Sequence, residues 1–268
     1  MNRPKQTLRA LWYRYLLLKQ YRKGQRFAKQ HEGNRLLCNF CGYPSDRFMP
    51  CGESFSVLEE LVVKSAGIRE DCRCPNCFSK DRDRLILEFL KLRTHVLDAP
   101  ARLLHMAPEP RLKTLFERTP QLDYVNADLD PILASEKEDL THLSFADASF
   151  DVVICNHVLE HIPDDRKAMR EILRVLKPGG WALLQVPIGR TLEVTREDPS
   201  ITDPRERERH FGQRDHVRIY GLDYPQRLEQ AGFSVKPIEP ADFLDAQDIE
   251  RLAILPEETL YQAFKPLA

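Results

Sequence analysis

The stretch of residues 139–188 constrains the fold more than any other part of the chain. It reads in order as a polar turn, an apolar run at 150–155, a helical pattern at about 164–176, a Pro-Gly-Gly break, and a second apolar run at 181–186. A strand, a crossover helix and a strand in that order form a βαβ unit, which predicts a parallel sheet with helices on its faces. Sheets of this kind bind small ligands at the carboxyl ends of their strands, so the residues that follow each strand are the first candidates for a site.

The charges of the chain are unevenly distributed. Its 268 residues, 42% apolar and 30% charged, are typical of a globular protein with one main domain and a smaller module. The net charge is −1, but residues 1–36 hold ten Lys or Arg against the single acid Glu32. That segment therefore carries about +9 and the rest of the chain about −10, which indicates a basic N-terminal arm on an acidic body.

The basic arm has the pattern of one helix. Its apolar residues recur at helical spacing between basic ones, at Leu8, Leu11, Trp12, Tyr15 and Leu18. Uninterrupted apolar runs are too short to span a bilayer, and Arg9 and Arg14 interrupt any signal-peptide core, so we expect a cytoplasmic protein. We favour a helix packed on the body, with peripheral docking on the inner face of an anionic membrane as the second interpretation and nucleic-acid binding as the least expected.

Four of the seven cysteines form two Cys-x-x-Cys pairs, which are Cys38 with Cys41 and Cys74 with Cys77. Two such pairs can present four thiolates to one structural, tetrahedral Zn²⁺, as in a zinc ribbon, and four thiolates leave no open position for catalysis. The gap between the pairs is long for a compact ribbon, so Cys51 and Cys72 stay open as spare or substitute ligands. Free thiols are the alternative, and disulfides are the least expected, because the cysteine count is odd and no secretory signal is present.

Several short motifs agree with one known family in content and in spacing. They are Asp139, Leu143, Phe145, Phe150-Asp151, Val158-Leu159-Glu160-His161 and Arg174-Val175-Leu176-Lys177-Pro178-Gly179-Gly180. With these motifs the chain resembles class I S-adenosylmethionine-dependent methyltransferases. The cysteine pairs and the Arg-rich helical segment at 81–94, with Leu85, Ile86, Phe89 and Leu92 as its apolar stripe, are similar to a bacterial subset of that family.

The resemblance implies a fold and a domain order. The fold would be α/β, with a doubly wound, mostly parallel seven-stranded sheet whose last strand is antiparallel. A basic helix at 1–35 and a zinc-ribbon-like module at 36–80 would precede a methyltransferase domain at 81–268, which holds a lid or acceptor insertion at 189–222.

The first strand of that domain, at 102–106, departs from the family pattern. His105 stands where the family has an acid, and Ala107, Glu109 and Arg111 stand where it has glycines. Without glycine the loop has less access to positive φ, so we expect a different path or a looser cofactor contact. Glu109 either pairs with the α-amino group of S-adenosylmethionine or favours the start of the next helix through its charge. By resemblance, His105, Ala107 and Glu109 are cofactor-binding candidates.

Acids at the next two strand ends are candidates to bind the nucleoside. Asp128, followed by Leu129, ends the predicted strand at 123–127, where a carboxylate can accept from both ribose hydroxyls. A turn or capping role is the alternative for Asp128. Asp139 and Leu140 stand where the family binds adenine, and a solvated loop acid is the alternative there.

The fourth strand is followed by Asn156 and His157, which we expect beside the sulfonium of the cofactor. Asn156 completes the predicted cofactor set. Methyl transfer chiefly requires that acceptor and donor be aligned, and a base is needed only for a weakly acidic hydroxyl. His157 is the best placed histidine for that role, whereas His161 fits packing or capping better.

Residues 189–215 are rich in charge and Pro and lack periodicity, so we expect a loop or lid over the acceptor site. The end of this segment and the residues after it bring a carboxylate, an imidazole and a guanidinium group close together in the sequence. Asp215 and His216 are the catalytic candidates there, and the substrate-binding candidates are His210, Arg218 and Tyr220. A salt-bridged hinge that holds the lid is the alternative.

The predicted function is methyl transfer from S-adenosylmethionine, with Zn²⁺ in a structural role. A hydroxyl of a sugar, in a glycan or glycolipid, is the leading acceptor, followed by another small molecule or RNA. The alternative is a zinc-ribbon binding or scaffold protein whose methyltransferase-like domain has lost catalysis, because the usual glycines are missing. The discriminating observation is whether the chain binds S-adenosylmethionine.

Overall fold

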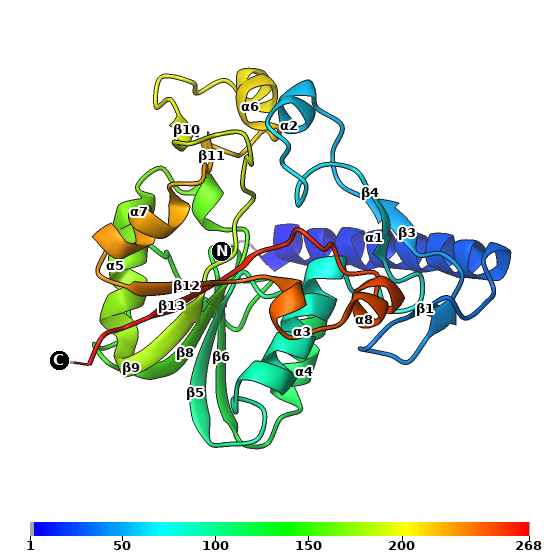
Figure 1. Ribbon diagram of the computed structural model, residues 1–268, viewed down its shortest axis with the longest axis horizontal. Coiled ribbons are helices and arrows are strands. Elements are labelled where there is room, and N and C mark those ends of the chain that lie inside the picture. The colour runs from blue at the N-terminus through cyan, green and yellow to red at the C-terminus, as the bar shows by residue number, and fades with distance from the viewer. Residues whose placement is uncertain (1–2, 268) are drawn as a thin grey trace.

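The computed structural model describes residues 3–267 and, at the level of side chains, residues 15, 16 and 18–267. Its centre is one seven-stranded sheet in the order β12-β13-β9-β8-β5-β6-β7 (Figure 1). The strands are β5 (Ala101–Met106), β6 (Leu122–Asp128), β7 (Glu136–Lys137), β8 (Phe150–Cys155), β9 (Leu176–Leu183), β12 (Ser234–Ile238) and β13 (Leu260–Phe264). Strand β13 runs antiparallel to both of its neighbours, β12 and β9, and the other strand pairs of this sheet are parallel. The predicted fold class is confirmed.

Helices cover both faces of the sheet because its strands are apolar on both sides. Leu103 and Val152 face one cluster, while their neighbours Leu104 and Val153 face the other, as the alternation of a strand requires. Helices α5 (Asp165–Val175) and α7 (Tyr224–Gln230) pack on one face. Helices α3 (Asp81–Arg93), α4 (Pro110–Glu117) and α8 (Ala246–Arg251) pack on the other (Figure 1).

The buried stripe of α3 differs by one residue from the prediction. Leu85, Ile86 and Phe89 are fully buried as expected, but Leu92 is 55% exposed and Leu90 is buried in its place. Residues 85, 86, 89 and 90 lie on one helical face, so the helix is rotated slightly about its axis relative to the prediction and turns this stripe toward the sheet.

The Pro-Gly-Gly segment does not break the chain before the second strand of the βαβ unit. Helix α5, capped by Asp164, ends at Val175, and β9 begins at once with Leu176. The strand continues through Gly179, whose φ of +77° permits the register shift against β8. Gly179 and Gly180 also exchange backbone hydrogen bonds with Lys265 after β13, so these residues belong to the sheet.

The strands of the cysteine-rich module lie beside α1 (Arg3–Gln30), and α3 and α8 stand between them and the sheet in Figure 1. The elements of the module are β1 (Leu36–Leu37), β2 (Pro44–Ser45), β3 (Met49–Cys51), α2 (Ser56–Glu60) and β4 (Arg69–Arg73). Helix α1 packs on the module at Gly24, where a Cβ would lie 2.3 Å from the carbonyl oxygen of Pro75. A larger side chain would therefore separate the two elements.

Two residues of the apolar stripe predicted for α1 lie among the described side chains, and both are exposed. Ala28 is buried, whereas Tyr15 and Leu18 are 55% and 60% exposed. The side chains of Leu8, Leu11 and Trp12 lie outside the described residues. Among the helices that the structure describes, none is both long and apolar enough to cross a membrane.

The predicted lid contains regular structure that its sequence did not indicate. Helix α6 (Pro204–Phe211) starts at Asp203, whose carboxylate accepts from two backbone N–H groups, and stops at Gly212 with φ of +79°. Two short strands, β10 (Arg196–Glu197) and β11 (Arg218–Ile219), pair antiparallel beside it. Phe211 packs against Val57 and Leu58, so the insertion rests on the cysteine-rich module through α2 (Figure 1).

Candidate functional site

The tip of β5 joins two of the predicted cofactor residues. Nε2 of His105 lies 2.7 Å from Oε2 of Glu109, and Oε1 of Glu109 accepts from Nδ2 of Asn156 at 3.3 Å. Burial alone would raise the pKa of Glu109. The hydrogen bond from His105 outweighs burial, so the pKa of Glu109 lies below its ordinary value. An ionised carboxylate is thereby held between the ends of β5 and β8.

The loop after β5 keeps a glycine-like path although it has no glycine. Ala107 has φ of +46°, in the left-handed region that costs a residue with a Cβ about 1–2 kcal/mol. The loop was expected to have less access to positive φ without glycine, and Ala107 adopts it nevertheless. Beside it lies a cavity of about 360 Å³, lined in part by Arg73, Lys80, Arg82, Glu109 and Arg111. The Nε atoms of Arg82 and Arg111 are buried without a hydrogen-bond partner.

The two predicted nucleoside acids also serve local turns. Oδ1 of Asp128 accepts from the backbone N–H of Asp130 at 2.7 Å. Asp139 is exposed, and its Oδ1 accepts from both the N–H and the hydroxyl of Thr141 at 2.8 Å. The hydrogen bonds from Thr141 lower the pKa of Asp139. Leu129 is exposed and Leu140 is buried. Ribose and adenine contacts by these residues stay predictions.

The tip of β8 combines a strained backbone with several unsatisfied polar groups. His157 has φ of +53°, and its N–H donates to the carbonyl of Gln185 at the end of β9. Its Nδ1 lies 3.4 Å from Oε1 of Glu160. Among the described residues, the buried atoms without a hydrogen-bond partner include Asn156 Oδ1, His157 Nε2, both Glu160 oxygens and Gln185 Oε1. Unpaired groups this closely spaced are typical of a site that a ligand completes.

Burial sets the protonation states at this tip. It raises the pKa of Glu160 to about 8 and lowers that of His157 well below its ordinary value. It also lowers the pKa of His216 to about 4. In the sequence, Glu160 stands out only as part of a motif. A single sequence does not show whether a glutamate at the start of a helix is buried or exposed.

The end of the insertion splits into two sets of residues. His216 is buried against His161, with ring centroids 4.7 Å apart, and the exposed Asp215 lies 3.2 Å from Nδ1 of His161. These residues do reach the β8 tip. His210 does not join them, since it lies on α6 with a half-exposed side chain 4.0 Å from Glu206.

Arg218 and Tyr220 require a correction, because protein contacts use up their polar atoms. Arg218 is 3% exposed and donates to the carbonyls of Leu159, Ile162 and Pro163 and to Glu197. The hydroxyl of the fully buried Tyr220 donates to Asp165 at 2.6 Å. Both residues anchor the insertion to the domain, which is the hinge role that the sequence left as the alternative.

The four cysteines of the two pairs converge as predicted. The sulphur atoms of Cys38, Cys41, Cys74 and Cys77 all lie within 4.8 Å of one another. Sγ of Cys38 lies 3.5 Å from that of Cys77, and Sγ of Cys41 lies 3.8 Å from that of Cys74. Sulphurs placed tetrahedrally around Zn²⁺ at ~2.3 Å are about 3.8 Å apart, so the donor set fits such an ion.

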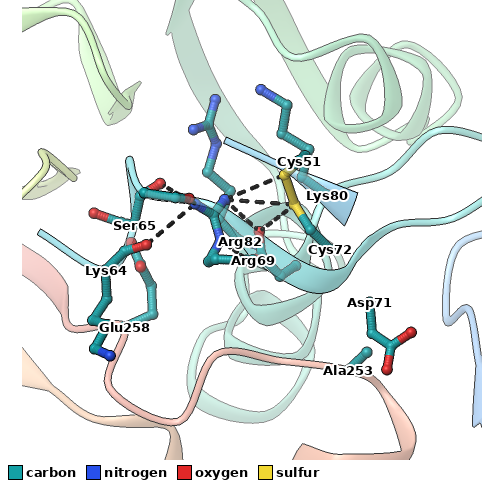
Figure 2. A network of polar contacts seen from close by, with 12 residues as sticks. Cys51, Lys64, Ser65, Arg69, Asp71, Cys72, Lys80, Arg82, Ala253 and Glu258 are labelled. Carbon is teal, nitrogen blue, oxygen red and sulfur yellow. Dashed lines mark hydrogen bonds and ion pairs between the residues drawn. A yellow bond between two sulfur atoms is a disulfide. The ribbon is translucent and has the colours of Figure 1, made fainter. Parts of the chain in front are cut away.

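The other two module cysteines form a disulfide, Cys51–Cys72, which corrects both the expected absence of disulfides and their role as spare ligands. Arg69 contacts both sulphurs at 3.5 Å and pairs with Asp81 at the start of α3 (Figure 2). Figure 2 also shows Lys80, Arg82 and Glu258 around this network. Two cationic side chains of the sequence SKDRDR, Lys80 and Arg82, thus reach the cavity beside Glu109.

Part of the chain is similar in sequence to known proteins. Residues 96–184 match a family described as a methyltransferase domain. A 27-O-demethylrifamycin SV methyltransferase of Amycolatopsis mediterranei is 34% identical over 114 residues, 42% of this chain and 40% of that protein. A ubiquinone biosynthesis O-methyltransferase of Albidiferax ferrireducens is 32% identical over 85 residues, 32% of this chain and 29% of that protein. The chain therefore spans less than half the length of these curated relatives.

A solved structure, phosphoethanolamine N-methyltransferase 2 of Haemonchus contortus with S-adenosyl-L-methionine, resembles the chain with a TM-score of 0.46 at 16% identity. The match covers 69% of this chain and 52% of that chain.

Proposed function

We propose that this chain, which carries a class I S-adenosylmethionine-dependent methyltransferase domain, is an enzyme that moves a methyl group from S-adenosylmethionine to an oxygen of its acceptor. The observation that carries the proposal is the group of buried, unpaired polar atoms at the ends of β8 and β9, next to the His105–Glu109 pair. Bound S-adenosylmethionine supplies a methyl carbon already activated by a positive sulphur, so the protein has mainly to hold and align.

The residues at the tip of β5 fit the methionine end of that cofactor, which carries one positive and one negative group. Glu109 is placed to accept from the α-amino group. Lys80, Arg82 and Arg111 line the same cavity and are placed to hold the α-carboxylate. Asp128 and Asp139 keep their predicted roles toward ribose and adenine.

His157 is our candidate for the residue that removes a proton from the acceptor. It is buried, its pKa is far below neutral, and its Nε2 has no partner, so a lone pair is available at pH 7. Oε1 of Glu160 lies 3.4 Å from Nδ1 of His157 and can orient the imidazole ring.

A hydroxyl of a sugar, in a glycan or glycolipid, is the acceptor that we propose. A second cavity of about 320 Å³ at the ends of β9, β12 and β13 supports a hydroxyl-rich ligand, because Arg190, Glu239 and Glu257 line it beside Val186 and Tyr261. Carboxylates accept from hydroxyl groups and apolar side chains cover the carbon face of a ring.

We make two further proposals, one for the four cysteines and one for α1. We propose that the four converging cysteines hold a structural Zn²⁺, which fixes the module on α3. We also propose that α1 makes peripheral contact with anionic membrane, since Leu16, Leu18 and Tyr21 are exposed there. Five bases and no acid occupy residues 15–30.

Radiolabelled S-adenosylmethionine tests the activity directly. We expect label to pass into a glycan or glycolipid fraction and far less into RNA or small phenols. Label in a different fraction would change the acceptor, whereas binding without transfer to any fraction would contradict the enzyme. No binding of S-adenosylmethionine or of its demethylated product would favour the scaffold alternative.

A further inference from the structure

A second group of metal-binding side chains lies at the tip of β8. Glu160 and His161 come from the short helix η1 (Leu159–His161), and His216 comes from the end of the insertion. One candidate ligand atom from each of the three residues lies within 4.8 Å of the other two. In the part of the chain that the structure describes, this group and the four cysteines are the two that meet this spacing.

Glu160 is the unusual member of the group. It is 1% exposed, and neither of its carboxylate oxygens has a hydrogen-bond partner. A buried carboxylate without hydrogen bonds is costly to keep, so such groups in folded proteins are paired or coordinate a metal. The nearest ring nitrogen, Nδ1 of His157, lies 3.4 Å away.

The neighbouring cations do not satisfy this carboxylate. Arg82 and Arg218 act on Glu160 through space, but neither donates a hydrogen bond to it. The guanidinium of Arg218 is directed to three backbone carbonyls and to Glu197. The carboxylate therefore receives no hydrogen bond from these cations, while a candidate ligand atom of each histidine lies within 4.8 Å of it.

The histidines have the surroundings of metal ligands. Nδ1 of His161 faces Asp215 at 3.2 Å, and a carboxylate on one ring nitrogen is the usual outer contact of a histidine that coordinates through the other. The ring of His216, 3% exposed, stands nearly perpendicular to that of His161 at 4.7 Å. Asp215 thus holds His161 from outside the group, and the ring contact holds His216 against His161.

We propose that Glu160, His161 and His216 bind a divalent first-row transition-metal cation at a second centre, separate from the four cysteines. Two imidazoles and one carboxylate suit Zn²⁺, Mn²⁺ or Fe²⁺ better than Mg²⁺ or Ca²⁺, and three protein ligands leave a position open. If the proposed methyl transfer is correct, that open position would orient an acceptor oxygen beside Asn156 and His157, but cation binding does not depend on it.

Mn²⁺ and Co²⁺ are the probes for the test, because the four-thiolate centre can first be filled with Zn²⁺. Mass spectrometry counts the metals of the full chain, and Mn²⁺ resonance or Co²⁺ absorption reports the second ion. We expect one such ion per chain beyond the cysteine-bound zinc. Glu160→Gln and His216→Asn should each lose about tenfold or more in affinity, and Asp215→Asn, exposed and outside the coordination sphere, should lose about tenfold.

His210→Asn is the matched control, since His210 is a histidine of the same insertion outside the group, and it should bind like the wild type. Thermal unfolding checks that each variant is folded. If a variant of a ligand residue does not fold, Asp215→Asn still tests the proposal. Unchanged Mn²⁺ affinity in folded Glu160→Gln, or no second ion in the wild type, would overturn the proposal. S-adenosylmethionine binding, measured on the same samples, reports separately on the proposed function.

Discussion

His105 and Glu109 form a buried pair at the tip of β5, with Nε2 of the histidine 2.7 Å from the carboxylate. The histidine replaces an acid, and the glutamate replaces a glycine, of the family pattern. A pair with a negative charge near the same place can serve the same purpose as the usual acid. The pair also ties the β5 loop to Asn156 at the tip of β8.

Glu109→Gln tests that replacement. The amide keeps the shape but loses the charge, so we expect S-adenosylmethionine affinity to fall about tenfold, as loss of a charge-assisted hydrogen bond predicts. Calorimetry on folded protein measures it. Glu117→Gln, an exposed acid at the end of α4, is the control and should bind normally. Equal affinities for both variants would show that Glu109 serves only the start of the helix.

Loss of the cysteine-bound metal should loosen the module. We expect Cys38→Ser to lose zinc and to lower the unfolding temperature, because metal binding energy in such sites is folding energy. Cys155→Ala, a buried cysteine outside the group, should keep its zinc. Elemental analysis and thermal unfolding provide both readings. Cys38→Ser protein with wild-type zinc content and stability would remove the metal from the account.

Tyr220→Phe tests whether Tyr220 stabilises the insertion or takes part in methyl transfer. The hydroxyl donates only to Asp165, which keeps its two contacts to Arg227 at 2.7 Å in the variant. We expect a loss of about 1 kcal/mol in the free energy of unfolding, the usual value of one hydrogen bond, with kcat and KM of the folded enzyme unchanged. Denaturant unfolding and steady-state kinetics measure the two effects. A large fall in kcat at unchanged stability would restore Tyr220 to the acceptor site.

Glu258 should make the folded state less stable as the pH rises. Burial raises its pKa to about 7, and its Oε1 accepts from Gln185 at 2.5 Å. The folded state therefore binds a proton that the unfolded state, with a pKa near 4.3, has lost, so stability falls between about pH 4 and pH 7. Glu258→Gln should remove that slope and add about 2 kcal/mol at pH 8. Unfolding free energies at pH 5 and pH 8 decide, and parallel pH profiles for both proteins would contradict this prediction.

The sequence was most informative where local pattern and tertiary role coincide. Strand β8 was predicted to the residue because its apolar run is bounded by polar turns, and the four cysteines were predicted because metal-ligand spacing is local. The crossover helix and the antiparallel last strand followed from the βαβ unit and the family motifs. These features depend on neighbours in the chain.

The features that were missed depend on contacts distant in sequence. Helix α6 lacks an apolar stripe of its own and buries only Phe211, against α2. Arg218 and Tyr220 were predicted to bind the substrate because they cluster with Asp215 and His216, but their partners lie about 55 residues upstream. Cys51 and Cys72 are 21 residues apart and show no spacing signal. Ala107 shows that a surrounding structure can hold positive φ without glycine.

Titration of the purified chain with S-adenosylmethionine and with its demethylated product is the most direct test of the cofactor site. We expect both to bind at one site per chain, the product to compete with S-adenosylmethionine, and Glu109→Gln to weaken the binding of both. A folded protein that gives no binding signal with either compound would contradict this expectation.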